Sequence, residues 1–382
     1  MNLTVNRLEL LAAVESAERI APAASPLDIL KCVCLETEEG RLTVAATNQE
    51  IAMERRLPAN ILENGRSAIN AKILLEMLRR LGGDTVTFEQ VDAPNTPESF
   101  FVSVKSGEAE YRIPAMNAGE YPRAEIPFPE DTVTVTGIPD MAKRTAFAAL
   151  EKAGDTRRCV FLRFDGANLS AVSTDGFRIA SAKGECKNSA NVNLLIPASS
   201  LARLAQLVTN KDEVQVGITG KTVVFMKEGL MFSARLMEGR YADVDMVMNS
   251  LKPRFAVLTN AEDVRNIVSS VCVVCGNQNR FKLSFGGGKL RAVCESENGV
   301  SKMELEVVAL SGTPSGDCWL NPVKLLECLR AQKGTMKLEM ATNGALIMRT
   351  EALICAQMGM REPKPVMRLN PATEAAALKE AA

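Results

Sequence analysis

The chain has 382 residues, of which 46% are hydrophobic and 24% charged, and its formal net charge is −1. This is the composition of a soluble globular protein, and no apolar run reaches the length of a membrane-spanning helix. The N-terminal residues lack the apolar stretch of a secretory signal, so we expect a cytoplasmic protein with no membrane partner.

The sequence contains no histidine. This absence excludes the Ser-His-Asp and Cys-His nucleophile arrangements and removes the commonest general base. No pair of carboxylates or lysines stands out as catalytic. We therefore predict no catalytic residue, no metal site and no cofactor, and we expect that the protein is not an enzyme.

In the first third of the chain, helical periodicity covers Arg7 to Ile20 and Asn70 to Leu78. The second of these helices has apolar residues at i, i+3 and i+4 from Leu74, and Asn70 suits an N-cap. Alternating apolar residues predict strands at Arg41 to Ala45, Thr85 to Val91 and Tyr111 to Met116.

The middle third predicts helices at Pro139 to Ala153 and Pro197 to Ala205. The first of these helices has the weaker pattern, because Arg144 and Thr145 fall on the face that should be apolar. Strands are predicted at Thr132 to Thr136, Glu213 to Thr219, Thr222 to Met226 and Phe232 to Met237.

The last third predicts one helix at Ala261 to Val271, which Asn260 caps, and another at Asn321 to Leu329. Strands are predicted at Phe281 to Phe285, Leu290 to Cys294, Met336 to Met340 and Leu353 to Met358. The glycines Gly286 to Gly288 lack the spacing of a phosphate-binding loop and lie between two of these strands, so we expect a hairpin turn. The corresponding turns are Glu39-Gly40 and Asp165-Gly166.

Three markers recur along the chain at nearly constant spacing. The second helix of each third recurs at offsets of 127 and 124 residues. Leu42, Leu169 and Leu290 each begin a strand after a turn, and Met116, Met237 and Met358 each close a strand. We infer an α+β fold of three repeated domains, each with two helices packed on antiparallel sheets.

The repeat divides the chain into domains at residues 1–121, 122–245 and 246–362, with linkers at Asn117 to Asp131 and Glu238 to Arg254. Residues 363–382 are Ala-rich, and we expect a mobile C-terminal tail. Among ten cysteines, only Cys272 and Cys275 have the spacing of a redox or metal-binding pair. No second pair or histidine completes a zinc site, so a structural helix end is favoured, and a redox protein stays as an alternative.

Two motifs resemble the beta subunit of bacterial DNA polymerase III, the sliding clamp family. Ser173 to Ala180 is similar to the family signature A-T-D-G-[HYF]-R-L-A, and Glu238 to Asp243 is similar to D/E-G-[RQ]-[FY]-P-D. Weaker matches follow the family order at Thr47 to Ile51, Gly119 to Pro122 and Met358 to Arg361. The resemblance covers residues 1 to 361.

The resemblance implies a homodimer whose six domains close a ring around duplex DNA, with the helices lining the hole. Such a processivity factor binds DNA without sequence specificity. Its implied partners are the replicative polymerase, the clamp loader and other proteins that carry clamp-binding peptides. On the helices, the implied DNA-facing residues are Lys72, Arg79, Arg80, Lys143, Arg144, Arg203, Lys324, Arg330 and Lys333. The implied dimer interface joins Tyr111 and Ile113 to Val273 and Val274.

The family also has a hydrophobic pocket for partner peptides. Carried over position by position, it comprises Thr174, Gly176, Phe177, Arg178, Ile179, Ala242, Val247, Met358, Gly359, Met360 and Arg361. Ala242 and Gly359 replace prolines of the family pattern, and Met246 stands where a basic residue is common. A diverged clamp-like scaffold with weakened DNA or partner binding therefore stays open. We also hypothesise that the tail, with its clamp-like Val366 to Leu369, modulates partner access.

Overall fold

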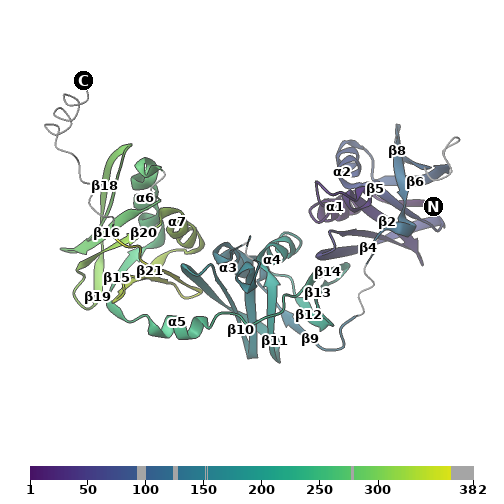
Figure 1. Cartoon of the computed structure of the whole chain (residues 1–382). Helices are drawn as coiled ribbons and strands as arrows, with labels where there is room; N and C mark the ends of the chain where they lie inside the picture. The colour runs from purple at the N-terminus through teal and green to yellow at the C-terminus, as the bar shows by residue number, and fades with distance from the viewer. Residues whose placement is uncertain (93–99, 124–127, 151, 153, 277–278, 363–382) are drawn as a thin grey trace, which may run out of the picture. The chain divides into compact units, whose positions relative to one another are not determined.

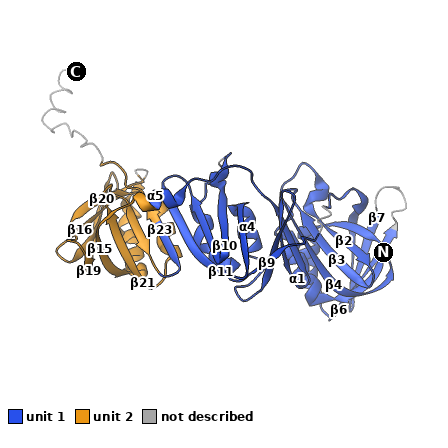
Figure 2. Cartoon of the chain, turned by 90° about the horizontal axis from the view of Figure 1, so that it is seen from below, with its two compact units in different colours: residues 1–248, 351–355 blue, residues 249–350, 356–382 orange. Residues whose placement is uncertain are grey.

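The computed structural model describes residues 1–92, 100–123, 128–150, 152, 154–276 and 279–362. The predicted tail, 363–382, lies outside the described residues. The chain divides into two compact units, residues 1–248 with 351–355, and residues 249–350 with the segment from 356 onward (Figure 2). The first unit contains two copies of the predicted repeat, and the second unit contains most of the third. The predicted domain boundaries stay a prediction.

The first copy of the repeat contains two packed helices and eight strands. Its helices are α1 (Arg7–Glu18) and α2 (Ala71–Arg80). Its strands are β1 (Asn2–Asn6), β2 (Cys32–Glu38), β3 (Arg41–Thr47), β4 (Ile51–Glu63), β5 (Arg66–Asn70), β6 (Thr85–Asp92), β7 (Phe100–Ser106) and β8 (Ala109–Asn117). Antiparallel pairs run in the order β5-β2-β3-β4-β1-β6-β7-β8, and β8 returns to β5 at Ala68 opposite Met116. The sheet therefore closes around an apolar core.

The second copy contains α3 (Ile138–Thr145) and α4 (Ala198–Leu204), which lie against each other and against its sheet (Figure 1). Its strands are β9 (Thr132–Val135), β10 (Cys159–Thr174), β11 (Arg178–Pro197), β12 (Val214–Thr219), β13 (Thr222–Lys227) and β14 (Leu230–Arg235). Strand β14 pairs with β4 from Leu230 opposite Arg55 to Ala234 opposite Ile51, so the two copies share one continuous sheet.

The predicted turn at Asp165-Gly166 falls inside β10, where the register with β11 breaks between Gly166 and Asn168. Phe161 and Val172, on opposite sides of this break, line the same pocket. An extended strand would hold residues eleven apart at about 36 Å. The chain therefore reverses direction at the break, as it does between β2 and β3 in the first copy.

In the second unit, α6 (Ala261–Val271) and α7 (Pro322–Ala331) pack on each other. The strands of the third copy are β15 (Pro253–Asn260), β16 (Phe281–Gly286), β17 (Lys289–Ser296), β18 (Gly299–Glu306), β19 (Val308–Ser311), β20 (Gly316–Leu320), β21 (Thr335–Ala341), β22 (Leu346–Arg349) and β23 (Leu353–Gln357). One sheet has the order β18-β17-β16-β20, and β15 pairs with β19 and β21. Gly287 and Gly288 form the β16–β17 hairpin, as predicted.

Helix starts agree with the sequence patterns. The side chain of Asn70 accepts a hydrogen bond from the Ile73 N–H at 3.1 Å, and Asn321 caps α7 through the Lys324 N–H at 3.1 Å. Asn260 caps α6 in the same way through Glu262. These caps satisfy backbone donors that a helix leaves unpaired at its first turn.

One predicted helix is wrong in length, and one short helix was not predicted. The helix predicted at Pro139 to Ala153 ends at Thr145 and continues only as a 3₁₀ turn over Ala146–Ala148. Thr145 is fully buried and its hydroxyl donates to the Met141 carbonyl at 2.8 Å, a contact that competes with regular helix continuation. The segment from Glu238 to Arg254 contains the short helix α5 (Val244–Ser250) that the sequence pattern did not predict. None of the helices in the described part of the chain has the length and apolar character needed to cross a bilayer.

Candidate partner-binding site

The signature motif of the second copy forms a tight turn between β10 and β11. The Thr174 hydroxyl donates to the Arg178 carbonyl at 2.7 Å and accepts from the Gly176 N–H at 3.1 Å. One carboxylate oxygen of Asp175 accepts the N–H groups of Phe177 and Arg178 at 2.9 and 3.0 Å. Gly176 has φ +89°, a conformation that glycine adopts without strain. The turn is therefore fixed by hydrogen bonds from the side chains of Thr174 and Asp175 to its own backbone.

Arg178 and Phe177 leave this turn in different ways. The Arg178 guanidinium is buried, lies 3.3 Å from the Asp175 carboxylate and donates to the Phe147 carbonyl at 2.6 Å. It also lies 5.3 Å from the centre of the Phe147 ring. The Phe177 side chain is 65% exposed. The arginine of the motif therefore holds the turn, and its aromatic side chain is left exposed.

Tyr241 ties the following linker to this turn. Its hydroxyl accepts from the Thr174 N–H at 3.0 Å and donates to the Cys159 carbonyl at 3.3 Å. Its ring stacks on Phe161 with centres 5.3 Å apart. Burial raises the pKa of the Tyr241 hydroxyl well above its usual value, so this hydroxyl keeps its proton at neutral pH.

The first copy repeats the hydrogen bonds of this arrangement. The Tyr121 hydroxyl accepts from the Thr47 N–H at 3.1 Å and donates to the Cys32 carbonyl at 3.3 Å. Asn48 takes the place of Asp175, and Gln49 has φ +73° where the second copy has Gly176. The same turn therefore follows β3 and β10, which shows that the repeat extends to individual hydrogen bonds.

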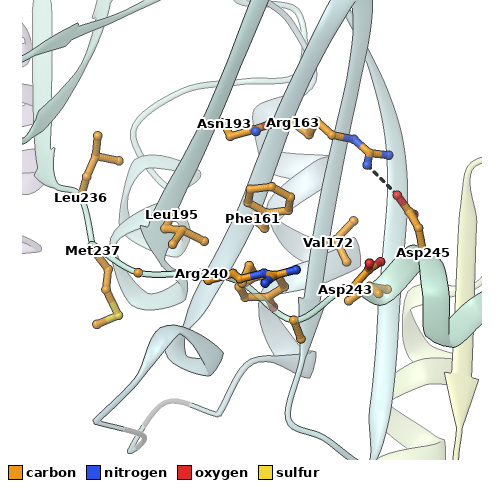
Figure 3. A pocket seen from close by; sticks show the side chains of 14 residues that line it. Phe161, Arg163, Val172, Asn193, Leu195, Leu236, Met237, Arg240, Asp243 and Asp245 are labelled. Carbon is orange, nitrogen blue, oxygen red and sulfur yellow. Dashed lines mark hydrogen bonds and ion pairs between the residues drawn. The ribbon is translucent and has the colours of Figure 1, made fainter.

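A pocket of about 460 Å³ lies between the linker and the strands β10 and β11 (Figure 3). Phe161, Val172 and Leu195 supply its apolar wall, and Arg163 forms an ion pair with Asp245 at 2.6 Å across it. Of the predicted peptide-site residues, only Ala242 lines this pocket. The Thr174 to Ile179 turn is not part of its lining.

The predicted peptide-site residues belong to both compact units. In the first unit, Ala242 is exposed and Val247 is half-buried on α5, next to Met246, which is 65% exposed. Thr174 and Ile179 are buried beside the turn. Met358 to Arg361 belong to the second unit. That these two groups act as one pocket stays a prediction.

The last predicted segment of the site is exposed but is held against its own unit by backbone contacts. The Met360 N–H donates to the Trp319 carbonyl at 2.7 Å, and the Met360 side chain is 39% exposed. A Cβ atom placed on Gly359 would lie 2.6 Å from the Gly344 carbonyl oxygen. The glycine that replaces the family proline is therefore required by the close approach of Gly344.

The predicted DNA-facing residues lie on or just after helices, and most are exposed. Lys72, Lys143, Arg203, Arg330 and Lys333 are exposed, and Lys324 is half-buried. Three arginines are partly neutralised: Arg79 pairs with Glu15 and Glu76, Arg80 with Glu76, and Arg144 with Asp140. Helix α1 adds the carboxylates Glu9, Glu15 and Glu18 against a single arginine. The positive bias therefore comes mainly from α2, α3, α4 and α7.

The predicted dimer residues differ in exposure. Val273 is 81% exposed and Val274 is half-buried in the second unit. Tyr111 is half-buried, and Ile113 is 7% exposed inside the core of the first unit. Both lie on β8, which pairs with β7 but leaves its other edge from Ala109 to Ala115 without a described partner strand.

Burial makes the thiols of Cys272 and Cys294 poor nucleophiles. It raises the pKa of Cys272 to about 12 and that of Cys294 to about 12, so neither thiol is ionised at neutral pH. Among the described residues, no group of three or more Cys, Asp or Glu side chains is arranged to hold a metal ion. The raised pKa of the Cys272 thiol disfavours the redox alternative at this residue.

Sequence reasoning missed the two tyrosine anchors and the pocket beneath the linker. Tyr121 and Tyr241 lie within the matched linker motifs, so the motif positions contained the signal. Their hydrogen bonds, however, join segments 74 and 67 residues apart in the chain. Patterns of neighbouring residues do not predict contacts between segments so far apart in the chain.

Comparisons with known proteins agree with this architecture. The family model of the DNA polymerase III beta subunit N-terminal domain matches residues 1–126, and that of the central domain matches residues 137–243. The beta sliding clamp of Bacillus subtilis is 21% identical over 329 residues, covering 81% of this chain and 84% of that protein. The beta sliding clamp of Staphylococcus aureus is 22% identical over 333 residues, covering 82% of this chain and 85% of that protein.

Solved structures share the fold at low sequence identity. The DNA polymerase sliding clamp from Bacillus subtilis superposes with a TM-score of 0.86 at 18% identity, covering 95% of this chain and 100% of that chain. The beta subunit from the DNA polymerase of Streptococcus pyogenes gives a TM-score of 0.86 at 21% identity with the same coverage. With two family domains matched over more than half of its length, the chain belongs to the DNA polymerase III beta subunit family, the beta sliding clamps.

Proposed function

We propose that this chain is a DNA sliding clamp, a processivity factor that encircles duplex DNA and tethers the replicative polymerase. The observation that supports this function best is the match of both family domains together with the clamp fold. The protein acts as a homodimeric ring of six domains in the cytoplasm. A ring linked topologically to DNA needs no tight or sequence-specific contacts and no catalytic residue.

The charge pattern supports loose DNA contact. Exposed basic side chains such as Lys72, Lys143 and Arg203 attract phosphates, while carboxylates on α1 and the paired Arg79 limit the attraction. Weak electrostatic contact allows the ring to slide along the duplex. Lys324, Arg330 and Lys333 act in the same way in the third domain.

Partner proteins bind through short peptides. Phe177 and Met360 supply exposed apolar surface, and Thr174, Gly176, Arg178 and Ile179 fix the turn that carries Phe177. Apolar anchors placed among a few fixed polar groups are typical of peptide recognition. The replicative polymerase, the clamp loader and other DNA-handling proteins compete for this site.

A loading experiment tests the function. The cognate clamp loader and ATP are mixed with labelled protein and nicked circular DNA, and the protein that stays on the DNA is separated by gel filtration. We expect retention on circles and its loss after linearisation, because an encircling ring slides off a free end. Equal retention on both DNA forms, or none on either, contradicts the proposal. Primer extension by the cognate replicase then measures processivity directly.

A second candidate, a clamp-like interaction scaffold, is favoured by the acidic α1 helix and by the neutralised arginines of α2 and α3. Such a scaffold binds clamp-binding peptides without being retained on circular DNA. The same experiment therefore separates the two functions when peptide binding is measured alongside DNA retention.

A further inference from the structure

The two copies of the repeat in the first unit differ at one strand seam. In the first copy, β1 pairs with β4 at four positions, from Asn2 opposite Glu63 to Val5 opposite Ala59. The equivalent strand of the second copy, β9, pairs with β11 only at Val135 opposite Cys186. Both strands begin their repeat and both also pair with the strand after the second helix, β6 or β12.

The seam of the second copy is spanned by a side chain. The Asn188 side-chain amide donates to the Thr132 carbonyl at 2.7 Å and accepts from the Thr134 N–H at 2.8 Å. A side-chain amide here replaces the backbone groups that form the ladder in the first copy. Beyond Asn188, the described backbones of β9 and β11 are therefore not joined by ladder hydrogen bonds.

A cavity of about 920 Å³ opens beside this seam, at the mouth of the second copy's core. Its floor includes the buried side chains of Phe164, Leu194 and Val216. At its rim, Phe128 is 67% exposed and Ile218 is 39% exposed. Exposed apolar groups around an apolar floor are typical of a binding groove.

In the first copy the same mouth is filled by Met1. The Met1 side chain is 4% exposed, its carbonyl accepts from the Gln90 N–H at 2.9 Å, and a Cβ atom on Gly65 would lie 2.6 Å from its own Cβ. Gly65 lies opposite Thr37 as Val192 lies opposite Phe164 in the second copy. The position of Met1 is taken in the second copy by Asp131, whose side chain is exposed.

The mouth of the second copy is also more apolar than that of the first. Phe164 and Leu194 occupy the positions that Thr37 and Ser67 hold in the first copy. The second copy nevertheless has no apolar side chain at the position of Met1, where it has Asp131. Glu130 and Asp131 are the charged residues among those that line the cavity, and both are exposed. An occupant with apolar and positive groups complements this lining.

One wall of the cavity is held by a close backbone approach. A Cβ atom on Gly217 would lie 2.4 Å from the Pro129 Cβ and 2.9 Å from the Asp131 carbonyl. The segment that carries Glu130 and Asp131 therefore packs directly on β12. The backbone that carries the two exposed carboxylates is therefore held at the rim of the cavity.

We propose that this mouth is a second docking site for a partner peptide, which inserts a Met- or Leu-sized side chain as Met1 does in the first copy and sets an adjacent Lys or Arg against Glu130 and Asp131. The site lies entirely within the second copy of the repeat. Its lining includes neither Phe177 nor Met360. With the proposed clamp function, on which this step rests, one protomer can hold a partner at two places and gain avidity.

A fluorescein-labelled peptide, Gly-Ser-Lys-Met-Lys-Ser-Gly-amide, tests the site by fluorescence anisotropy with the full chain. We expect saturable binding that weakens about tenfold when Met is replaced by Ala in the peptide, about 1.4 kcal/mol. Replacing both Lys by Glu in the peptide abolishes binding. Failure to bind at millimolar protein, or equal binding of the Met and Ala peptides, overturns the proposal.

Protein variants locate the binding. We expect Ile218→Asp to weaken the Met peptide about tenfold, and Glu130→Gln with Asp131→Asn to weaken it about threefold at low salt with little effect at high salt. Leu62→Asp, at an exposed residue of the first copy, is the matched control and leaves binding unchanged. Phe177→Ala reports whether the peptide binds at the turn of Phe177 instead. Thermal melting confirms that each variant is folded, and amide exchange reports protection at residues 188–192 on binding. Loss of binding in Phe177→Ala instead, or a change of oligomeric state in Ile218→Asp without an effect on peptide, assigns the mouth to another role and refutes the site.

Discussion

The Tyr241 hydroxyl accepts a hydrogen bond from the backbone N–H of Thr174 over 3.0 Å. This contact joins the linker after the second repeat to the turn that carries Phe177. Tyr121 makes the same contact with Thr47 after the first repeat. A hydroxyl buried between two backbone groups thus sets where each linker leaves its domain.

Removal of this hydroxyl tests its contribution. We expect Tyr241→Phe to lower the free energy of unfolding by about 1–3 kcal/mol, because the Thr174 N–H stays buried without its acceptor. Urea denaturation followed by circular dichroism measures the change. Tyr121→Phe is the matched variant and should lose a similar amount through Thr47. Unchanged stability in both variants contradicts the role of the anchors.

Arg178 and Phe177 are neighbours with opposite expected phenotypes. Arg178→Met leaves the buried Asp175 carboxylate without its cation and should cost about 3–5 kcal/mol of stability. Phe177→Ala changes an exposed side chain and should alter stability by no more than about 0.5 kcal/mol. We expect Phe177→Ala to weaken the binding of a clamp-binding peptide from the cognate polymerase, measured by anisotropy. A destabilised Phe177→Ala, or one with full peptide affinity, argues against this division.

We expect the contact of Glu304 with Lys289 and Arg291, in the second unit, to be sensitive to acid. Hydrogen bonds from Lys289 and Arg291 lower the pKa of Glu304 to about 2, below the value of about 4.3 for a glutamate in an unfolded chain. Because the folded state holds the ionised form, the stabilisation is present above about pH 4.3 and is lost as the pH falls toward 2. Glu304→Gln should therefore be less stable than the parent chain at pH 7 and equal to it near pH 2, measured by urea denaturation. A constant difference between these pH values refutes the coupling.

We expect position 359 not to tolerate proline, the residue of the family pattern. Gly359→Pro or Gly359→Ala places a Cβ atom 2.6 Å from the Gly344 carbonyl oxygen, so the backbone must shift. We expect a loss of about 1–3 kcal/mol in stability, the usual cost of overpacking. Thermal denaturation measures it, with Ala242→Pro as the control at the other replaced proline, where the residue is exposed. A fully stable Gly359→Pro variant contradicts the packing argument.

Val273 gives the sharpest test of the proposed dimer. Its side chain is 81% exposed, so Val273→Asp should not disturb folding of its own unit. We expect this variant to be monomeric by native mass spectrometry, because a charge buried in an apolar interface is strongly unfavourable. Leu62→Asp, at a residue with 72% exposure, is the control and should stay dimeric. Ile113 is unsuitable for this test because it belongs to the core of its own domain.

The sequence by itself determined the repeat, the helix starts and most strands. Asn70, Asn260 and Asn321 cap helices where their positions predict, because a cap depends on residues two or three apart. The family motifs also identified the segment from Ser173 to Ala180 and the linker that contains Tyr241. These features are local, so neighbouring side chains are sufficient to specify them.

Only the tertiary structure decided which motif residues are exposed and where the repeats differ. The buried Arg178 guanidinium is held by Phe147, which is distant in sequence, whereas the neighbouring Phe177 side chain is exposed. Met1 fills the core mouth of the first copy while Asn188 holds the second one open, although the two copies share the same order of elements. Such differences arise from packing between segments far apart in the chain. The volume of one side chain or one hydrogen bond decides whether the core is closed, and no periodic sequence pattern predicts this.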